Sequence, residues 1–190
     1  MTLAIPPSSG LFGTVLTVGH GPTDRDKLGT LLSTAGVQQV VDVRRFPGSR
    51  NSPDVGRDLL AHWLPELGIA YRWEERLGGR RALPKHDRSQ DPWWTVAAFR
   101  AYAAHTRTAE FAAALDEVLA AAGVRQVVIM CSESVWWRCH RRVISDVVVL
   151  QREVAVQHLM PDGRLSAHPV AQGARLHGDG AIYWDGAESD

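Results

Sequence analysis

The sequence has few cysteines, almost no lysine and no long hydrophobic run. Two cysteines in 190 residues are too few for a disulfide framework and are typical of a reducing compartment. No apolar run approaches the roughly 20 residues that a membrane-spanning helix needs. The N-terminal residues lack the charged region and the apolar stretch of a signal peptide. We therefore expect a cytoplasmic protein that does not contact a membrane.

Net charge is also absent, because 21 Lys and Arg residues balance 21 Asp and Glu residues. This balance excludes bulk basicity as a route to nucleic acid, but it leaves room for a local basic patch. Lys27 and Lys85 are the only lysines, so nearly every basic residue is an arginine, whose planar guanidinium suits phosphate and carboxylate groups. A GC-rich genome would give the same bias, so the positions of the arginines have to decide.

Alternating strand and helix patterns predict an α/β fold. Residues 14–18 and 39–43 are expected to be parallel strands joined by a helix that begins after Asp24 and ends at Gly36. Residues 126–130 form the most hydrophobic run and are expected to be a central, buried strand. The remaining predicted elements are helices over 54–67, 93–105, 108–122 and 135–151 and strands over 69–73 and 154–159.

These elements predict one domain over residues 14–170, a three-layer, mostly parallel sheet with helices on both faces. A chain of this length can bury a sizeable core without disulfides or structural metals. Residues 1–13 are expected to be a flexible leader, and residues 171–190, with scattered glycines and acidic residues, a loosely ordered tail.

Polar residues follow the predicted strands at the edge where ligands bind in open parallel sheets. Because the carboxyl ends of parallel strands meet at one edge, we expect these side chains to form one rim. The rim residues are His20 after the first strand, Asp42, Arg44, Arg45, Ser49 and Arg50 after the second, and Cys131, Glu133, Trp136, Trp137, Cys139, His140 and Arg141 after the fourth.

The loop after the second strand carries three arginines in seven residues, beside Asp42 and within a Pro-Gly-Ser segment. This density predicts an anion site in which Arg44, Arg45 and Arg50 contact phosphate. Each residue also has a simpler interpretation. His20 is typical of a turn or a helix cap, Asp42 suits a loop cap or an arginine partner, and the arginines suit a solvated surface.

Cys131-x-Glu133-x5-Cys139-His140 is compatible with four kinds of site. Metal ligation by the cysteines and His140 is disfavoured because there is no Cys-x2-Cys pair, and we expect neither a metal nor a cofactor. A sulfur-transfer or phosphatase loop would place Cys131 correctly, but Arg138 lies one residue too far along. A redox pair of the two cysteines is a third interpretation. The fourth, which we favour, treats both cysteines as small buried hydrophobes and makes Glu133 and the arginines the working groups.

Six motifs in a fixed order extend over residues 14–170. They are Gly19-His20, Asp42-Val43-Arg44 with Pro47, Ser49 and Arg50, Gly68-Ile69 with Tyr71 and Leu77-Gly78-Gly79, Phe99 with Tyr102, Cys131 and Glu133 with Cys139-His140-Arg141, and His158, Gly163 and His168. With these motifs the chain resembles the DUF488 family of small, uncharacterised bacterial and archaeal proteins. One departure is Gly21, where the family usually has serine. The resemblance supports the α/β fold and implies a connection with nucleic-acid processing, including excision of altered bases.

We expect a nucleic-acid-directed hydrolase, similar to a DNA glycosylase, that contacts DNA locally. Asp42 or Glu133 would act on water, and His20 or His140 would donate a proton near neutral pH. Arginines Arg44, Arg45, Arg50 and Arg141 would hold phosphates, while Trp136 or Trp137 would stack on an extruded base. Two alternatives remain: a thiol or sulfur-transfer enzyme with Cys131 as nucleophile and Cys139 as resolving thiol, and a non-enzymatic module that binds a nucleotide or phosphate.

Overall fold

A computed structural model describes residues 13–48, 53–83 and 90–186. Most of the predicted leader, together with the predicted phosphate-binding residues Ser49 and Arg50, lies outside these residues. Most of the predicted strands and helices lie within a few residues of the observed ones, because apolar positions recur at the period of each element. The helix predicted over 135–151 instead begins at Arg141, after a 3-10 turn over Trp136–Arg138, and three short strands after residue 160 were not predicted.

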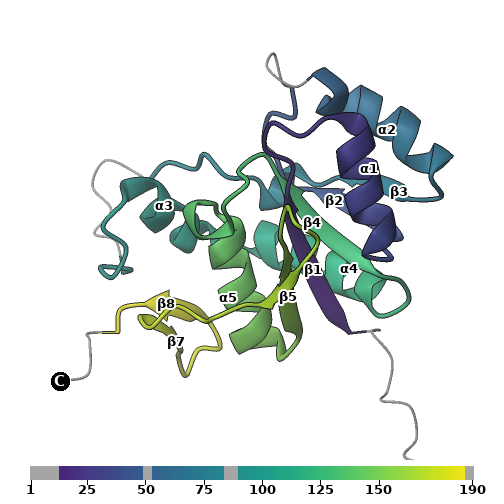
Figure 1. Cartoon of the computed structure of the whole chain (residues 1–190). Coiled ribbons are helices and arrows are strands. Elements are labelled where there is room, and N and C mark those ends of the chain that lie inside the picture. Colours follow the sequence, from purple (N-terminus) through teal and green to yellow (C-terminus); the bar gives the residue numbers. More distant parts are fainter. Residues whose placement is uncertain (1–12, 49–52, 84–89, 187–190) are drawn as a thin grey trace, which may run out of the picture.

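The centre of the fold is a six-stranded sheet with the strand order β3-β2-β4-β1-β5-β6 (Figure 1). The first five strands in this order are parallel, and only β6 runs antiparallel to its neighbour. This confirms the predicted mostly parallel sheet. The strands are β1 (Thr14–Gly19), β2 (Gln39–Asp42), β3 (Ala70–Trp73), β4 (Val127–Cys131), β5 (Ala155–Leu159) and β6 (Leu165–Ala167).

Helices cover both faces of the sheet, as predicted. Neighbouring residues of β1 point to opposite faces, so Leu16 packs with Leu28 and Leu60 on one side while Val15 packs with Leu115 and Val148 on the other. In the described part of the chain no helix is long and apolar enough to cross a membrane. The first face carries α1 (Arg25–Thr34) and α2 (Arg57–Glu66), and the second carries α3 (Ala97–Thr106), α4 (Ala109–Ala122) and α5 (Arg141–Arg152).

Strand β4 occupies the central position predicted for the most hydrophobic run. It lies between β1 and β2, whose Thr17 and Val41 both pair with Ile129 of β4. The chain leaves β1 toward α1 on one face and leaves β4 toward α5 on the other. Adjacent strands with connections to opposite faces leave a crevice at their carboxyl ends, where open α/β sheets bind ligands.

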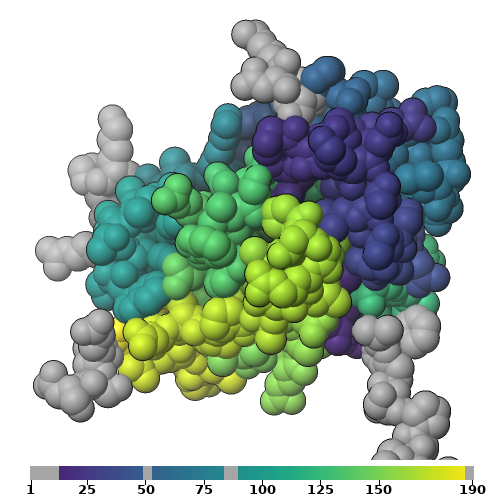
Figure 2. Space-filling model, in the orientation of Figure 1, coloured from purple at the N-terminus to yellow at the C-terminus, as the bar shows by residue number. Residues whose placement is uncertain are grey.

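The prediction of a loosely ordered segment over residues 171–190 is wrong for residues 171–186. They form the hairpin β7 (Ala174–Leu176) and β8 (Ile182–Trp184), which in Figure 2 lies in yellow against the green and teal segments. Trp184 is fully buried, and its indole nitrogen donates to Asp146 Oδ2 over 2.8 Å. Gly178, Asp179 and Gly180 form the tight turn of this hairpin, where small and turn-forming residues are needed. Residues 187–190 lie outside the described part of the chain.

Candidate active site

A cavity of about 420 Å³ opens at the carboxyl ends of β1, β2 and β4, at the crevice that the topology creates. Five segments line it: the turn after β1, the loop after β2, residues 79–80, residues 96–102 at the start of α3, and the segment that joins β4 to α5. The lining residues that matter below are His20, Arg44, Arg45, Phe46, Arg80, Arg138, Cys131, Ser132, Glu133, Cys139 and His140.

Two cysteines and a histidine meet in the wall of this cavity. Cys131 ends β4, while Cys139 and His140 follow a short 3-10 turn over Trp136–Arg138 that leads the chain back to the sheet. His140 Nδ1 lies 3.8 Å from Cys131 Sγ and 3.6 Å from Cys139 Sγ. All three donor atoms lie within 4.8 Å of one another, and both cysteines are buried free thiols.

Arg141 places a buried positive charge against this cluster. Its Nε donates to Cys139 Sγ over 3.4 Å and its Nη2 donates to the carbonyl of Glu133. No carboxylate within the described residues forms an ion pair with this guanidinium. Burial alone raises the pKa of Cys139, but the hydrogen bond from Cys131 and the charge of Arg141 lower it to about 6. The hydrogen bond to Cys139 and burial raise the pKa of Cys131 to about 12. The opposite shifts make Cys139 the more acidic thiol of the pair.

Close packing at Gly19 brings the first and fourth strand ends together. A Cβ atom at this position would collide with the carbonyl oxygen of Glu133 and would lie 2.6 Å from Arg141 Nη2. Only glycine lets the Glu133 backbone reach β1, and that contact fixes the carbonyl to which Arg141 donates. The Gly19-His20 motif thus has a steric function as well as a chemical one.

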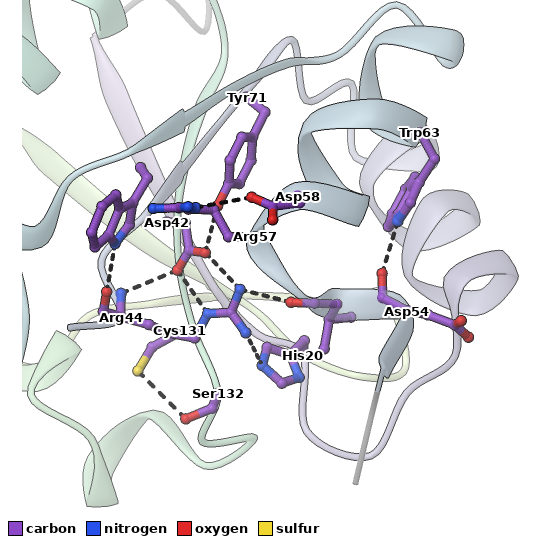
Figure 3. Close-up of polar contacts among 12 residues, drawn as sticks. His20, Asp42, Arg44, Asp54, Arg57, Asp58, Trp63, Tyr71, Cys131 and Ser132 are labelled. Atoms are coloured by element: carbon purple, nitrogen blue, oxygen red, sulfur yellow. Dashed lines mark hydrogen bonds and ion pairs between the residues drawn. The ribbon is translucent and has the colours of Figure 1, made fainter. Parts of the chain in front are cut away.

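Asp42, a predicted catalytic carboxylate, is fully buried and does not line the cavity. Its Oδ1 accepts from Arg44 Nε over 2.8 Å, and its Oδ2 accepts from Arg44 Nη2 over 2.6 Å (Figure 3). Tyr71 donates its hydroxyl to Oδ2 over 2.8 Å. Both carboxylate oxygens are thus occupied, and Asp42 fixes the position of Arg44, which does face the cavity.

His20 lies in the cavity but is not arranged to donate a proton there. Its Nδ1 lies 2.7 Å from the carbonyl oxygen of Gly21. Its Nε2 lies 3.1 Å from Arg44 Nη1 (Figure 3). A carbonyl only accepts and a guanidinium only donates, so Nδ1 carries the proton and Nε2 accepts from Arg44. Burial and the Arg44 charge lower the pKa of His20 despite the opposing bond to Gly21. The neutral ring therefore holds Arg44, and the predicted proton-donor role does not fit this geometry.

The mouth of the cavity is positively charged. Arg45, Arg80 and Arg138 line it, and none of them forms an ion pair with a carboxylate in the ranges that the structure describes. Phe46 is 64% exposed and lies between Arg45 and Arg80. The guanidinium carbons of these two arginines lie 5.8 and 6.0 Å, respectively, from the centre of the Phe46 ring. Glu133 is exposed and is the only carboxylate residue among the cavity-lining residues. The mouth is thus suited to an anion with some apolar surface.

The two tryptophans predicted to stack on a base lie elsewhere. Trp136 stacks on His158, with 4.1 Å between ring centres and 7° between ring planes. Trp137 is about half exposed, and neither residue lines the cavity. Arg45, Cys131, Glu133, Cys139 and His140, in contrast, are brought together as predicted, with Arg141 directly behind them.

Sequence reasoning missed Arg80 and Tyr102, which also line the cavity. Arg80 follows Gly78-Gly79 in a left-handed backbone conformation, with a φ of 57°. A Cβ at Gly79 would lie 2.9 Å from His140 Nδ1, so the glycine pair lets this loop lie against the cluster. The Gly-Gly pair before a basic residue was the available signal. The motif of Phe99 and Tyr102 was the available signal for Tyr102, and Phe99 lines the cavity as well.

Comparison with known proteins identifies the family and nothing finer. No curated protein and no solved structure matches the chain. The model of a domain of unknown function, DUF488, matches residues 24–148. This range includes Cys131, Glu133, Cys139, His140 and Arg141 and covers well over half of the chain. The protein therefore belongs to the DUF488 family.

Proposed function

We propose that this protein is an enzyme that uses a cysteine thiolate to attack a small anionic substrate in the cavity at the ends of β1, β2 and β4. The observation that carries the proposal is the buried guanidinium of Arg141, whose Nε points at Cys139 Sγ. A buried cation needs a negative partner, and a thiolate at Cys139 supplies it. A positive charge beside a cysteine is also the usual way to activate it as a nucleophile.

The geometry favours Cys139 as the nucleophile and Cys131 as the resolving thiol, the reverse of the order expected from the sequence. Cys139 contacts Arg141, whereas Cys131 lies next to Ser132 Oγ at 4.0 Å and shares only His140 with the other cysteine. The opposite pKa shifts of the two thiols support the same assignment. Strand-end placement alone could not distinguish the two residues.

The mouth of the cavity supports an anionic substrate. Arg45, Arg80 and Arg138 lack carboxylate partners among the residues that the structure describes, and Arg44 is fixed nearby by Asp42 and His20. A chain without net charge concentrates its attraction here, which favours a small ligand over a long polyanion. A volume of about 420 Å³ lies within the range typical of small-molecule sites.

A small anionic disulfide is the substrate that two neighbouring thiols suit best. The Cys139 thiolate attacks one sulfur, the substrate S–S bond breaks, and the released thiolate takes a proton from water. The Cys131 thiol then loses its proton to water and attacks Cys139 Sγ, which releases the second substrate thiolate and joins the two cysteines. The substrate disulfide gains two electrons and the cysteines lose two. A low-molecular-weight thiol reduces the protein disulfide for the next cycle.

The test is turnover of small disulfides that carry carboxylates, compared with a neutral disulfide of similar size. We expect Cys139→Ser to abolish the reaction and Cys131→Ser to trap a mixed disulfide on Cys139, visible by mass spectrometry. Arg138→Gln should lower turnover of the anionic disulfides only. Arg125→Gln is the matched control, because Arg125 lies just before the start of β4, at the opposite end of that strand from the cavity. Equal turnover in Cys139→Ser and in the unmodified protein would contradict the proposal.

The second candidate is the nucleic-acid-directed hydrolase, and Glu133 favours it. A base-excising enzyme needs a carboxylate beside the reacting sugar, and Glu133 is the carboxylate that lines this cavity. The test is alkali-sensitive strand breakage in labelled DNA that carries altered bases. Breaks that vanish in Glu133→Gln and persist in Cys139→Ser would establish this function and overturn the thiol enzyme. Binding of anions without turnover of DNA or disulfides would instead indicate a non-enzymatic module.

A further inference from the structure

The Cys131, Cys139 and His140 cluster has the dimensions of a metal site. For Zn–S bonds of about 2.3 Å and Zn–N bonds of about 2.05 Å, a tetrahedron requires sulfur and nitrogen ligands about 3.6 Å apart. The observed separations from His140 Nδ1 are 3.6 Å to Cys139 Sγ and 3.8 Å to Cys131 Sγ. The two sulfurs lie within 4.8 Å of each other, and the third edge of such a tetrahedron is about 3.8 Å long.

We propose that Cys131, Cys139 and His140 bind a Zn²⁺ ion whose fourth ligand position faces the cavity. Two thiolates and one imidazole form a donor set that selects zinc over harder cations. All three residues line the cavity, so water or an anionic ligand can reach the fourth position. The site goes beyond the proposed function, since it depends on the placement of three donor atoms and not on catalysis by either cysteine.

The fold brings together three metal-ligating residues that are not closely spaced in the sequence. The absence of a Cys-x2-Cys pair argues against a metal only when the ligands come from one tight turn. Here Cys131 comes from the end of a strand, and Cys139 and His140 come from the start of a helix. The intervening 3-10 turn returns the chain to the strand end, so ligands eight residues apart meet in space.

The hydrogen bonds around the cluster orient its donor atoms. Arg141 Nε donates to Cys139 Sγ, the kind of outer hydrogen bond that orients a thiolate ligand. His140 Nδ1 has both sulfurs as neighbours, while its Nε2 is buried and has no hydrogen-bond partner among the described residues. The sulfurs are therefore the polar groups that the ring faces. With Nδ1 on the metal, Nε2 carries the hydrogen.

Zinc and a disulfide substrate would compete for the same two sulfurs. A thiolate held by zinc is less available for attack, and a Cys131–Cys139 disulfide leaves no thiolate for the metal. Zinc would thus act as a reversible inhibitor of the thiol chemistry, a consequence that rests on the proposed function. The site itself does not rest on it.

The first test uses the full chain, reduced and stripped of metal, titrated with Zn²⁺ against a chromophoric chelator and with Co²⁺ as a spectroscopic probe. We expect one ion per chain and thiolate-to-cobalt charge-transfer absorption. Cys131→Ser, Cys139→Ser and His140→Ala should each lower the affinity for Zn²⁺ by at least about 100-fold, because each removes a direct ligand. His62→Ala, which removes an exposed histidine on α2, should bind as the unmodified protein does.

The second test needs no variant and therefore does not depend on variant folding. X-ray absorption at the zinc edge of the loaded, unmodified protein should report two sulfur neighbours and one imidazole nitrogen. A zinc shell of oxygen alone, or unchanged zinc affinity in folded Cys139→Ser, would overturn the site. Zinc binding without turnover of any disulfide by the metal-free protein would keep the site and reject the thiol enzyme. Disulfide turnover without zinc binding would reject the zinc site and keep the thiol enzyme.

Discussion

Arg141 Nε and Cys139 Sγ lie 3.4 Å apart inside the protein, and this contact joins the helix α5 to the wall of the cavity. It is a charge-assisted hydrogen bond, stronger than one between neutral groups. Because the guanidinium always carries its charge, the sulfur is the partner that adapts its protonation. We therefore expect Arg141 to control the reactivity of Cys139.

Replacement of Arg141 is the direct test of this control. We expect Arg141→Gln to raise the pKa of Cys139 from about 6. Alkylation of Cys139 in the reduced, metal-free protein should then slow at pH 7, by about twofold if the pKa rises to 7 and by about tenfold if it rises to 8. The rate in the unmodified protein should fall below pH 6, where the thiolate takes up a proton. Site-resolved mass spectrometry measures both. Arg142→Gln is the matched control, since Arg142 lies over Trp93 and Trp94 instead.

Asp42 should behave as a structural residue and not as a catalyst. Asp42→Asn leaves the buried Arg44 guanidinium without its counter-ion, which costs about 3–5 kcal/mol of unfolding free energy. Chemical denaturation measures the loss. Asp58→Asn, which breaks the exposed pair with Arg57, should leave the denaturation midpoint unchanged. An Asp42→Asn protein of normal stability but no activity would instead restore Asp42 to the catalytic machinery.

The C-terminal hairpin should contribute to stability. Trp184→Ala removes a fully buried indole and the donor to Asp146, so we expect a loss of about 3–5 kcal/mol. Leu176→Ala, in the same hairpin but with 53% of its side chain exposed, should have little effect. Thermal unfolding of the two variants distinguishes them. Equal unfolding temperatures would mean that the hairpin does not support the core.

Acid should destabilise the protein through His158. Burial and the neighbouring His168 lower the pKa of His158 to about 3, from an ordinary value of 6.5. Between pH 6.5 and about 3, His158 is therefore protonated in the unfolded chain and neutral in the folded protein. The free energy of unfolding falls as the pH falls through this range. His158→Gln should reduce the slope of unfolding free energy by up to about 1.4 kcal/mol per pH unit. The exposed His62, changed to Gln, serves as the control, and equal slopes in both variants would contradict the assignment.

The strand ends could be predicted from the sequence because hydrophobic periodicity locates the strands and the sheet topology collects their ends. The sequence therefore predicts Cys131 and Cys139 in one site and favours, without deciding, the interpretation in which both are buried. Their chemical state was not, because it depends on Arg141 reaching back toward Cys139 Sγ. That contact requires the bare backbone of Gly19, a packing detail that no local pattern encodes.

The residues whose predicted roles do not fit are those with competing partners in space. Asp42 follows β2 as expected, yet its oxygens are taken by Arg44 and by Tyr71 from the neighbouring strand. Trp136 follows β4 as expected, yet its ring meets His158 of β5. The sequence predicts the edge of the sheet on which a side chain lies. It does not predict which residue the side chain contacts, because that residue comes from a strand distant in the sequence.

The central position of β4 has a consequence for how the protein acquires its structure. Residues 127–131 insert between two strands that are complete by residue 42. Until they arrive, β1 and β2 cannot pair with each other in the native order, and each keeps an open hydrogen-bonding edge. Such long-range parallel pairing is slow and leaves apolar strands available to other chains. We therefore expect β4 to set the folding rate, and folding intermediates that lack it to be the species that aggregate.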